Sequence, residues 1–178
     1  MRAKNLDDSG GMRLQDWATV KAALDQGLGQ ATAPDAGGPN RFTTWLTTIN
    51  PDGSPHVTPV GAVWVDDAYW FQTGAGTRKA KNVARDARCS VSVSAHDFDL
   101  VIDGVAEKVT DQHSIERVVA EWNAGGWPCE VDASGTGVTA PFNAPAVGPP
   151  PWSVYRIAPR SATSVSTQEP GGTTRWTF

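Results

Sequence analysis

A short basic stretch that follows two glycines is the part of this sequence best suited to chemistry. Residues 73–82 read Thr-Gly-Ala-Gly-Thr-Arg-Lys-Ala-Lys-Asn, and a helix is predicted over residues 78–86. Backbone N–H groups converge at a helix start and carry a partial positive charge, to which Arg78 and Lys79 add full charges. Cations in a first turn oppose the helix dipole, and a bound anion would offset that placement. The stretch predicts a phosphate site, and an exposed basic helix on a solvated face is the alternative.

The charge balance supports an anion near this helix. The chain of 178 residues has a net charge of −4, which disfavours general nucleic-acid binding because that function needs a basic surface. Between residues 78 and 88 the only acid is Asp86. The basic residues of that segment are Arg78, Lys79, Lys81, Arg85 and Arg88.

A second candidate lies at residues 57–62, which read Val-Thr-Pro-Val-Gly-Ala and contain no acid, base or nucleophile. Such a strand offers backbone polar groups and a small surface against which a flat ring can lie. Pro59 and Gly61 indicate an irregular strand, because proline donates no ladder bond and glycine permits close approach. An ordinary core strand is the alternative.

No set of side chains resembles a metal cage or a nucleophilic triad. The histidines, His56, His96 and His113, are few and scattered, and no G-x-S-x-G motif is present. Cys89 and Cys129 belong to no C-x-x-C pattern and are interpreted as free thiols of a reducing compartment. Where a cofactor supplies hydride chemistry, the protein needs only to bind it, orient it and exclude water.

The elements that must position these residues follow from periodicity and turn residues. Helical spacing predicts helices over residues 14–28, over residues 78–86 with Thr77 as N-cap, and after an N-cap at Thr110 or Asp111. The predicted strands are residues 41–49, 56–65, 68–73, 88–95, 98–109, 152–166 and 173–178. Short connections favour antiparallel pairing, and closure into a barrel hides the edges of so many strands.

The chain is expected to form a single domain over residues 13–178, preceded by a mobile tail over residues 1–12. Residues 29–40 are rich in Gly, Pro and Ala and are predicted to be a linker. Residues 125–151 form a long Gly- and Pro-rich segment, which we expect to shape a substrate entrance. No apolar run approaches the roughly 18 residues of a membrane span, and no signal segment is evident, so the expected compartment is the cytoplasm.

Several segments, in order, resemble the split β-barrel superfamily that contains pyridoxamine 5′-phosphate oxidase and the flavin and deazaflavin oxidoreductases. The resemblance covers roughly residues 39–178 and is carried by residues 52–60, 69–73, 77–91, 152–159 and 173–178. It implies a mainly β, antiparallel split barrel that binds FMN or a deazaflavin, with short flanking helices.

The resemblance also implies site residues. The phosphate contacts of such proteins fall on Arg78 and Lys79, with Lys81 and Asn82 close by. The ring would rest on Val57, Thr58, Pro59 and Val60. The ribityl chain would approach Phe71 and Thr73. These proteins are typically homodimers with the cofactor at the subunit interface, so the second chain is expected to supply Trp152 or Arg175.

The same resemblance favours coenzyme F420, a deazaflavin with a phospholactyl-oligoglutamate tail, and leaves FMN as the alternative. The basic helix and the C-terminal Thr-Arg-Trp-Thr-Phe look like the F420-dependent actinobacterial branch, and Lys81, Arg85 and Arg88 would suit the longer anionic tail. The Arg and His pattern that grips pyridoxamine is missing from the C-terminus, which disfavours vitamin B6 oxidation. The expected substrate is a small conjugated or unsaturated molecule.

A binder of another class remains open. Relatives in this superfamily hold haem, tetrapyrrole or flavin without obvious turnover. A haem protein would need an axial ligand, and His56, His96 and His113 are the histidines available.

Overall fold

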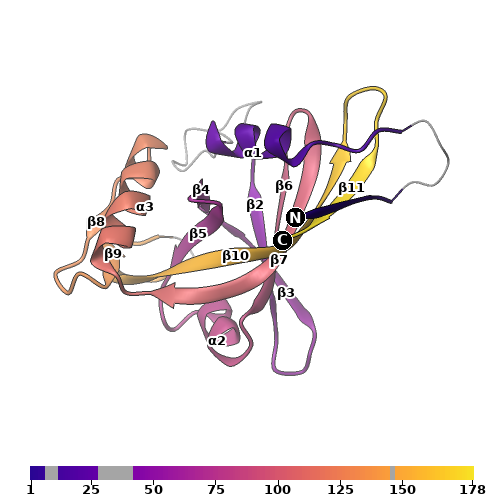
Figure 1. The fold of residues 1–178 in the computed structure, drawn as a ribbon. Coiled ribbons are helices and arrows are strands. Elements are labelled where there is room, and N and C mark those ends of the chain that lie inside the picture. Colours follow the sequence, from indigo (N-terminus) through magenta and orange to yellow (C-terminus); the bar gives the residue numbers. More distant parts are fainter. Residues whose placement is uncertain (7–11, 28–41, 145–146) are drawn as a thin grey trace.

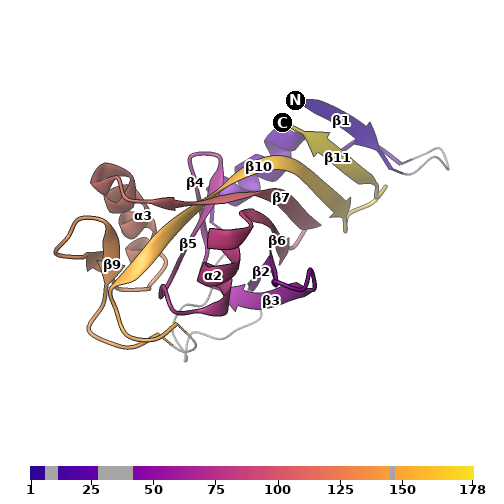
Figure 2. The ribbon, with the colours of Figure 1, turned by 90° about the horizontal axis from the view of Figure 1, so that it is seen from below.

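The predicted strands assemble into one antiparallel sheet in the computed structural model, which describes residues 1–6, 12–27, 42–144 and 147–178 (Figures 1 and 2). The strands are β1 (Arg2–Asn5), β2 (Thr44–Ile49), β3 (Pro55–Val60), β4 (Val63–Val65), β5 (Ala68–Thr73), β6 (Arg88–Ser94), β7 (Phe98–Val109), β8 (Glu130–Val131), β9 (Gly137–Thr139), β10 (Trp152–Ser166) and β11 (Thr173–Thr177). The helices of the described residues are α1 (Trp17–Asp25), α2 (Arg78–Arg85) and α3 (Gln112–Ala124).

The strand order explains why the sheet curls around a core. Its main path runs β1-β11-β10-β7-β6-β2-β3, while β5 joins β4 to β10, and β9 joins β8 to β10. The 15-residue β10 therefore pairs with four other strands along its length. The mainly β, antiparallel split barrel expected from the sequence is confirmed.

Two hydrophobic cores fill the molecule, and β5 separates them. Its alternating side chains place Tyr69 and Phe71 in the larger core, inside the barrel, and Ala68 and Trp70 in the smaller one. The smaller core lies under α3 and the β8–β9 hairpin and contains Trp122 among its largest buried side chains. In Figure 1, α1 and β4 lie at the top of the molecule and α2 at the bottom.

Each helix begins at a capping side chain. Asp16 accepts a hydrogen bond from the Ala18 N–H at the start of α1, and Asp111 accepts one from the Ser114 N–H at the start of α3. Of the two candidates for the α3 cap, Asp111 is therefore the correct one. Thr77 caps α2, as predicted.

Other segments differ from the sequence prediction. Residues 2–5, expected in a tail, form β1 and pair with β11. The strand predicted over residues 56–65 divides into β3 and β4 at Gly61 and Ala62, the irregularity that Pro59 and Gly61 indicated. The segment 125–151 contains β8 and β9 rather than loop alone.

The ends of two predicted elements also changed. Helix α1 begins only at Trp17, because Asp16 is its cap, and Leu14 lies before it. The predicted linker 29–40 lies outside the described residues, as does Leu28. Within the described ranges, no helix combines the length and the apolar character that a membrane crossing requires.

Candidate functional site

The loop from β5 to α2 is organised by two threonines. The Thr77 hydroxyl accepts the Ala80 N–H at 3.3 Å and donates to the Gly74 carbonyl at 2.9 Å. Thr73 is fully buried and lies 3.0 Å from the same hydroxyl, so Thr73 is the donor of that pair. Thr73 therefore stabilises the helix start from inside the core and does not face a ribityl chain.

Lys79 is the unusual residue of this helix start. Its side chain is buried, with 6% of the residue exposed, and it has no hydrogen-bond or ion-pair partner among the described residues. Burial lowers the pKa of Lys79 from its usual value, because desolvation disfavours the charged form. A lysine whose side chain is largely buried without a counter-charge fits an anion that binds from outside the chain.

The neighbouring basic residues divide into free and engaged groups. The side chains of Arg78 and Lys81 are exposed and form no hydrogen bond or ion pair within the described part of the chain, although the Arg78 charge contributes to the lowered pKa of Asp52. Arg85 donates to the Ile49 carbonyl. Arg88 pairs with Asp86 at 2.7 Å, and this contact is the main reason why the pKa of Asp86 falls to about 2. The free cations therefore belong to the first turn and a half of α2.

Asn82 attaches α2 to the sheet. It is buried, and its Nδ2 donates to Thr48 Oγ1 and Asn50 Oδ1, both at 3.1 Å. Both amide protons are thus used within the chain, and the remaining oxygen can only accept. The predicted phosphate contact from Asn82 does not fit this geometry, because a phosphate needs donors.

The strand expected to carry the ring, β3, is a free edge of the sheet. Among the described strands it pairs with β2 alone. At the turn between these strands, the Asn50 N–H donates to the Ser54 carbonyl at 2.8 Å. Hydrogen-bonded and non-hydrogen-bonded positions alternate along an antiparallel pair. The backbone N–H and C=O groups of His56, Thr58 and Val60 therefore point toward β2. Those of residues 55, 57 and 59 face away from the sheet.

Two of these three outward positions are prolines. Val57 therefore has the single backbone N–H directed away from β2 along β3, flanked by outward carbonyls. The side chains of Val57 and Pro59 are exposed on one face of the strand, whereas Thr58 and Val60 are half-buried on the other. A ring could contact the edge backbone, but the four side chains cannot meet it from one side.

The remaining predicted contacts are separated from this group. Phe71 is fully buried and stacks on Tyr155, with ring centroids 5.0 Å apart, so it offers no surface to a ribityl chain. Trp152 is 1% exposed and its Nε1 donates to the Gly148 carbonyl at 3.0 Å, so it belongs to its own subunit's core and does not face a partner. Only Arg175 is accessible, on the outer face of the sheet.

The segment before β10 reaches the helix start. The Val147 carbonyl lies so close to Gly74 that a Cβ on Gly74 would be 2.3 Å from its oxygen. The aromatic side chains of the long segment, Trp127 and Phe142, pack around Trp152. The segment thus adjoins the candidate phosphate site, and the role of Gly74 was signalled in the sequence only by its place after a strand.

The thiols and histidines offer no separate chemistry. Cys89 and Cys129 are free and buried, and burial raises the pKa of both thiols to about 12, so neither is a thiolate at neutral pH. His96 and His113 are exposed and His56 is half-buried. In the described residues no group of three or more His, Cys, Asp or Glu side chains could hold a metal ion.

Comparison with known proteins agrees with the architecture. A family profile described as pyridoxamine 5′-phosphate oxidase matches residues 38–161, well over half of the chain. No curated protein matches.

Solved structures share the fold. A conserved hypothetical protein of Mycobacterium tuberculosis is 29% identical over 68% of this chain and 75% of its own, with a TM-score of 0.52. A pyridoxamine 5′-phosphate oxidase-related, FMN-binding protein of Nostoc punctiforme is 15% identical over 92% and 91%, with a TM-score of 0.55. PhzG of Burkholderia lata, in complex with tetrahydrophenazine-1-carboxylic acid, is 17% identical over 76% of both chains, with a TM-score of 0.51. From the extent of the profile match, the chain belongs to the pyridoxamine 5′-phosphate oxidase family of flavin-binding oxidoreductases.

Proposed function

We propose that this protein is an oxidoreductase that uses coenzyme F420 and passes a hydride between the deazaflavin ring and a small conjugated or unsaturated organic molecule. The observation that carries the proposal is the largely buried side chain of Lys79 at a helix N-terminus, which has no counter-charge among the described residues. A phosphate supplies the missing charge, and F420 and FMN each carry one.

The roles of the chain's own residues follow from their positions. Lys79 binds the phosphate as an inner contact, and Arg78 and Lys81 add charge from the solvent side. The Val57 N–H at the edge of β3 offers one donor to a ring oxygen or nitrogen, and the flanking prolines restrict the strand. When bound, the cofactor supplies the hydride chemistry, so the protein's tasks are to bind, orient and exclude water.

FMN is the second candidate, and one observation favours it. Of the three basic residues expected to meet a long anionic tail, Arg85 and Arg88 have partners within the chain. Lys81 is then the only free one. A cofactor that ends at a single phosphate needs no more than Arg78 and Lys79.

Titration with F420 and, separately, with FMN tests the proposal. Quenching of the eight tryptophans reports binding. We expect F420 to bind with micromolar affinity, Lys79→Met to abolish binding, and Lys81→Met to weaken F420 more than FMN. Lys108→Met, at an exposed lysine of β7, is the matched control. Tighter binding of FMN would assign the site to a flavin, and binding of neither would refute the function.

The proposal includes a homodimer whose second copy completes the site. One face of β2, β3 and β7 exposes Trp45 (44%), Val57 (54%) and Val101 (39%). Trp45 lies opposite Pro59 of β3 on one side and opposite Ser92 of β6 on the other, and Ser92 lies opposite Val101 of β7. Side chains at paired positions point to the same face, so these residues are neighbours on one surface of the sheet. Arg175 lies on the same face, where it donates to Ser161 Oγ at 3.0 Å and lies 3.7 Å from a carboxylate oxygen of Asp103. An apolar patch beside the ring strand suits a partner subunit.

A further inference from the structure

We infer that Lys79 is a nucleophile as well as an anion ligand, and that it captures small phosphorylated aldehydes as an imine at the start of α2. The ligand class is a phosphate ester that carries an aldehyde a few bonds from its phosphate. The inference rests on the anion site of the proposed function, but the covalent chemistry involves neither a deazaflavin nor a flavin. Capture would occupy the phosphate position and so compete with the cofactor.

The start of α2 offers donors for the phosphate that the fold itself leaves unused. The Lys81 N–H donates to the Thr77 carbonyl, and the Ala80 N–H donates to the Thr77 hydroxyl. The N–H groups of Arg78 and Lys79 come before the first intrahelical bond and have no acceptor among the described residues. Free N–H groups at a helix start, next to a guanidinium group, suit one phosphate without using the Lys79 amine.

The Lys79 amine is directed to the same place. A helical side chain leans toward the N-terminus of its helix, so the Lys79 side chain extends toward the free N–H groups. The residue is 6% exposed, and its Nζ has no partner among the described residues. Within those residues, the sealed side-chain polar atoms that lack a partner are the Tyr69 hydroxyl and the Gln72 amide oxygen. The Lys79 Nζ is not one of them, so the nitrogen stays accessible while its stem is buried.

Burial also favours the form of Lys79 that attacks a carbonyl carbon. Only the neutral amine is a nucleophile, and desolvation lowers the pKa of Lys79 from its usual value. The nitrogen attacks the aldehyde carbon, a C–N bond forms, and the carbonyl oxygen leaves as water with two protons that the ammonium form held on nitrogen. The product is a protonated imine, so the positive charge stays beside the phosphate. The step needs no oxidant or reductant, and water reverses it.

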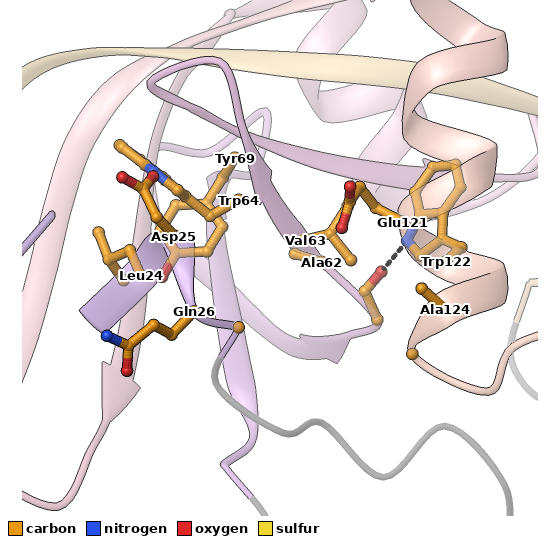
Figure 3. Close-up of a pocket in the computed structure, with 13 residues that line it drawn as sticks. Leu24, Asp25, Gln26, Ala62, Val63, Trp64, Tyr69, Glu121, Trp122 and Ala124 are labelled. Carbon is orange, nitrogen blue, oxygen red and sulfur yellow. Dashed lines mark hydrogen bonds between the residues drawn. The ribbon is translucent and has the colours of Figure 1, made fainter. Parts of the chain in front are cut away.

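The cavity of about 300 Å³ between α1, the β3–β4 break and α3 offers no comparable group (Figure 3). No lysine is among its described lining residues, and its carboxylates, Asp25 and Glu121, repel a phosphate. The Trp122 Nε1 at its edge already donates to the Gly61 carbonyl at 3.0 Å. Capture of a phosphorylated aldehyde is therefore expected at α2 and not in this cavity.

Reductive trapping in the full-length protein tests the inference, because cyanoborohydride converts a protonated imine into a stable secondary amine. The probes are glyceraldehyde 3-phosphate, glyceraldehyde and glycerol 3-phosphate, and peptide mapping by mass spectrometry locates the product among the five lysines of the chain. We expect glyceraldehyde 3-phosphate to label Lys79 about tenfold more than glyceraldehyde does at the same concentration, because the bound phosphate holds the aldehyde beside the amine. The exposed Lys4 and Lys108 should show no such preference. Glycerol 3-phosphate has no aldehyde and should protect Lys79.

One substitution separates the Lys79 amine from its charge. The guanidinium group of Lys79→Arg keeps the charge and forms no imine under these conditions. This variant should lose the labelling at position 79, yet bind glycerol 3-phosphate more tightly in calorimetry than Lys79→Met does. Lys108→Arg is the matched control and should be labelled at Lys79 like the wild-type protein. Equal labelling of all the lysines, or labelling of Lys79 that does not depend on the phosphate, would overturn the inference.

Competition with the cofactor distinguishes this inference from the proposed function. F420 or FMN that binds through Lys79 should protect it from labelling. Binding of either cofactor without any capture of the aldehyde would overturn the inference and leave the function intact. Phosphate-dependent capture by a protein that binds neither cofactor would support the inference and refute the function.

Discussion

Lys79 combines burial with charge in a way that folding alone does not explain. An ammonium group taken out of water raises the free energy of the folded state unless an anion meets it. Replacement of Lys79 by Met, of similar length, should therefore stabilise the cofactor-free protein on the order of 1 kcal/mol while it abolishes cofactor binding. Urea unfolding of the wild-type protein and of Lys79→Met, both without cofactor, measures this difference in stability. A less stable variant would show that the ammonium group has a structural partner.

The difference in stability between the wild-type protein and Lys79→Met should depend on pH, and the direction of that dependence follows from the lowered pKa of Lys79. Because burial lowers the pKa of Lys79 in the folded protein, the destabilisation is complete below the lowered pKa and is relieved as pH rises through it toward the unfolded value. The stability advantage of Lys79→Met should thus shrink as pH increases from neutral. Cofactor affinity should fall over the same window, and Lys79→Arg, whose charge persists, should show a flatter profile. Affinity that is independent of pH up to about 10 would contradict a role for the Lys79 charge.

The sequence reveals the run of basic residues at the candidate site more directly than the burial of the polar and aromatic residues predicted beside it. A charge run after glycines is visible in a sequence, and in the described residues the side chains of Arg78, Lys79 and Lys81 form no hydrogen bond or ion pair. Asn82 differs, because whether an amide faces a ligand or the neighbouring strand depends on which side of α2 meets β2. The burial of Trp152 likewise depends on the second core, which no local pattern reveals.

The position of α2 depends on a close backbone approach. Replacement of Gly74 by Ala would place a Cβ 2.3 Å from the Val147 carbonyl oxygen, so the segment before β10 must move. We expect Gly74→Ala to destabilise the protein by about 1–3 kcal/mol and to weaken cofactor binding. Gly76→Ala is the control, because a Cβ there meets nothing within 4 Å, and it should change stability by less than about 0.5 kcal/mol. Thermal unfolding compares the two, and equal effects would refute the packing argument.

Helices and strands could be predicted where one hydrophobic periodicity dominates the sequence. Their ends could be predicted where a capping residue or a turn residue is present. Residues 68–73 are rich in aromatic side chains and residues 98–109 in β-branched ones, and both segments form strands with the expected bounds. β1 could not be predicted, because a four-residue polar strand forms only through its pairing with β11. The edge position of β3 was also hidden, although Pro55 and Pro59 fit the outward positions that such an edge allows.

At the scale of the whole molecule, one exposed apolar face of the sheet has the character of a subunit interface. Trp45 and Val101 leave apolar surface exposed on the face that also carries Arg175. If this face is the dimer interface, Trp45→Glu should produce monomers in light scattering, because it would bury a charge there. Leu14→Glu, at another exposed apolar residue, should remain dimeric. A dimeric Trp45→Glu variant would exclude this face.

A dimer alone does not show that the site is shared, and mixing two defective variants does. Lys79→Met and Arg175→Ala would each remove one side of a shared site, so each homodimer should lose cofactor binding. After unfolding and refolding together in equal amounts, random pairing gives about half heterodimers, in which one of the two sites has both native residues. About a quarter of the wild-type binding capacity should then return. If Lys79 and Arg175 act within one chain, or if Arg175 serves only its contacts with Ser161 and Asp103, mixing restores nothing beyond the sum of the separate variants. The recovered fraction, measured by F420 or FMN titration, therefore decides whether the second subunit completes the site.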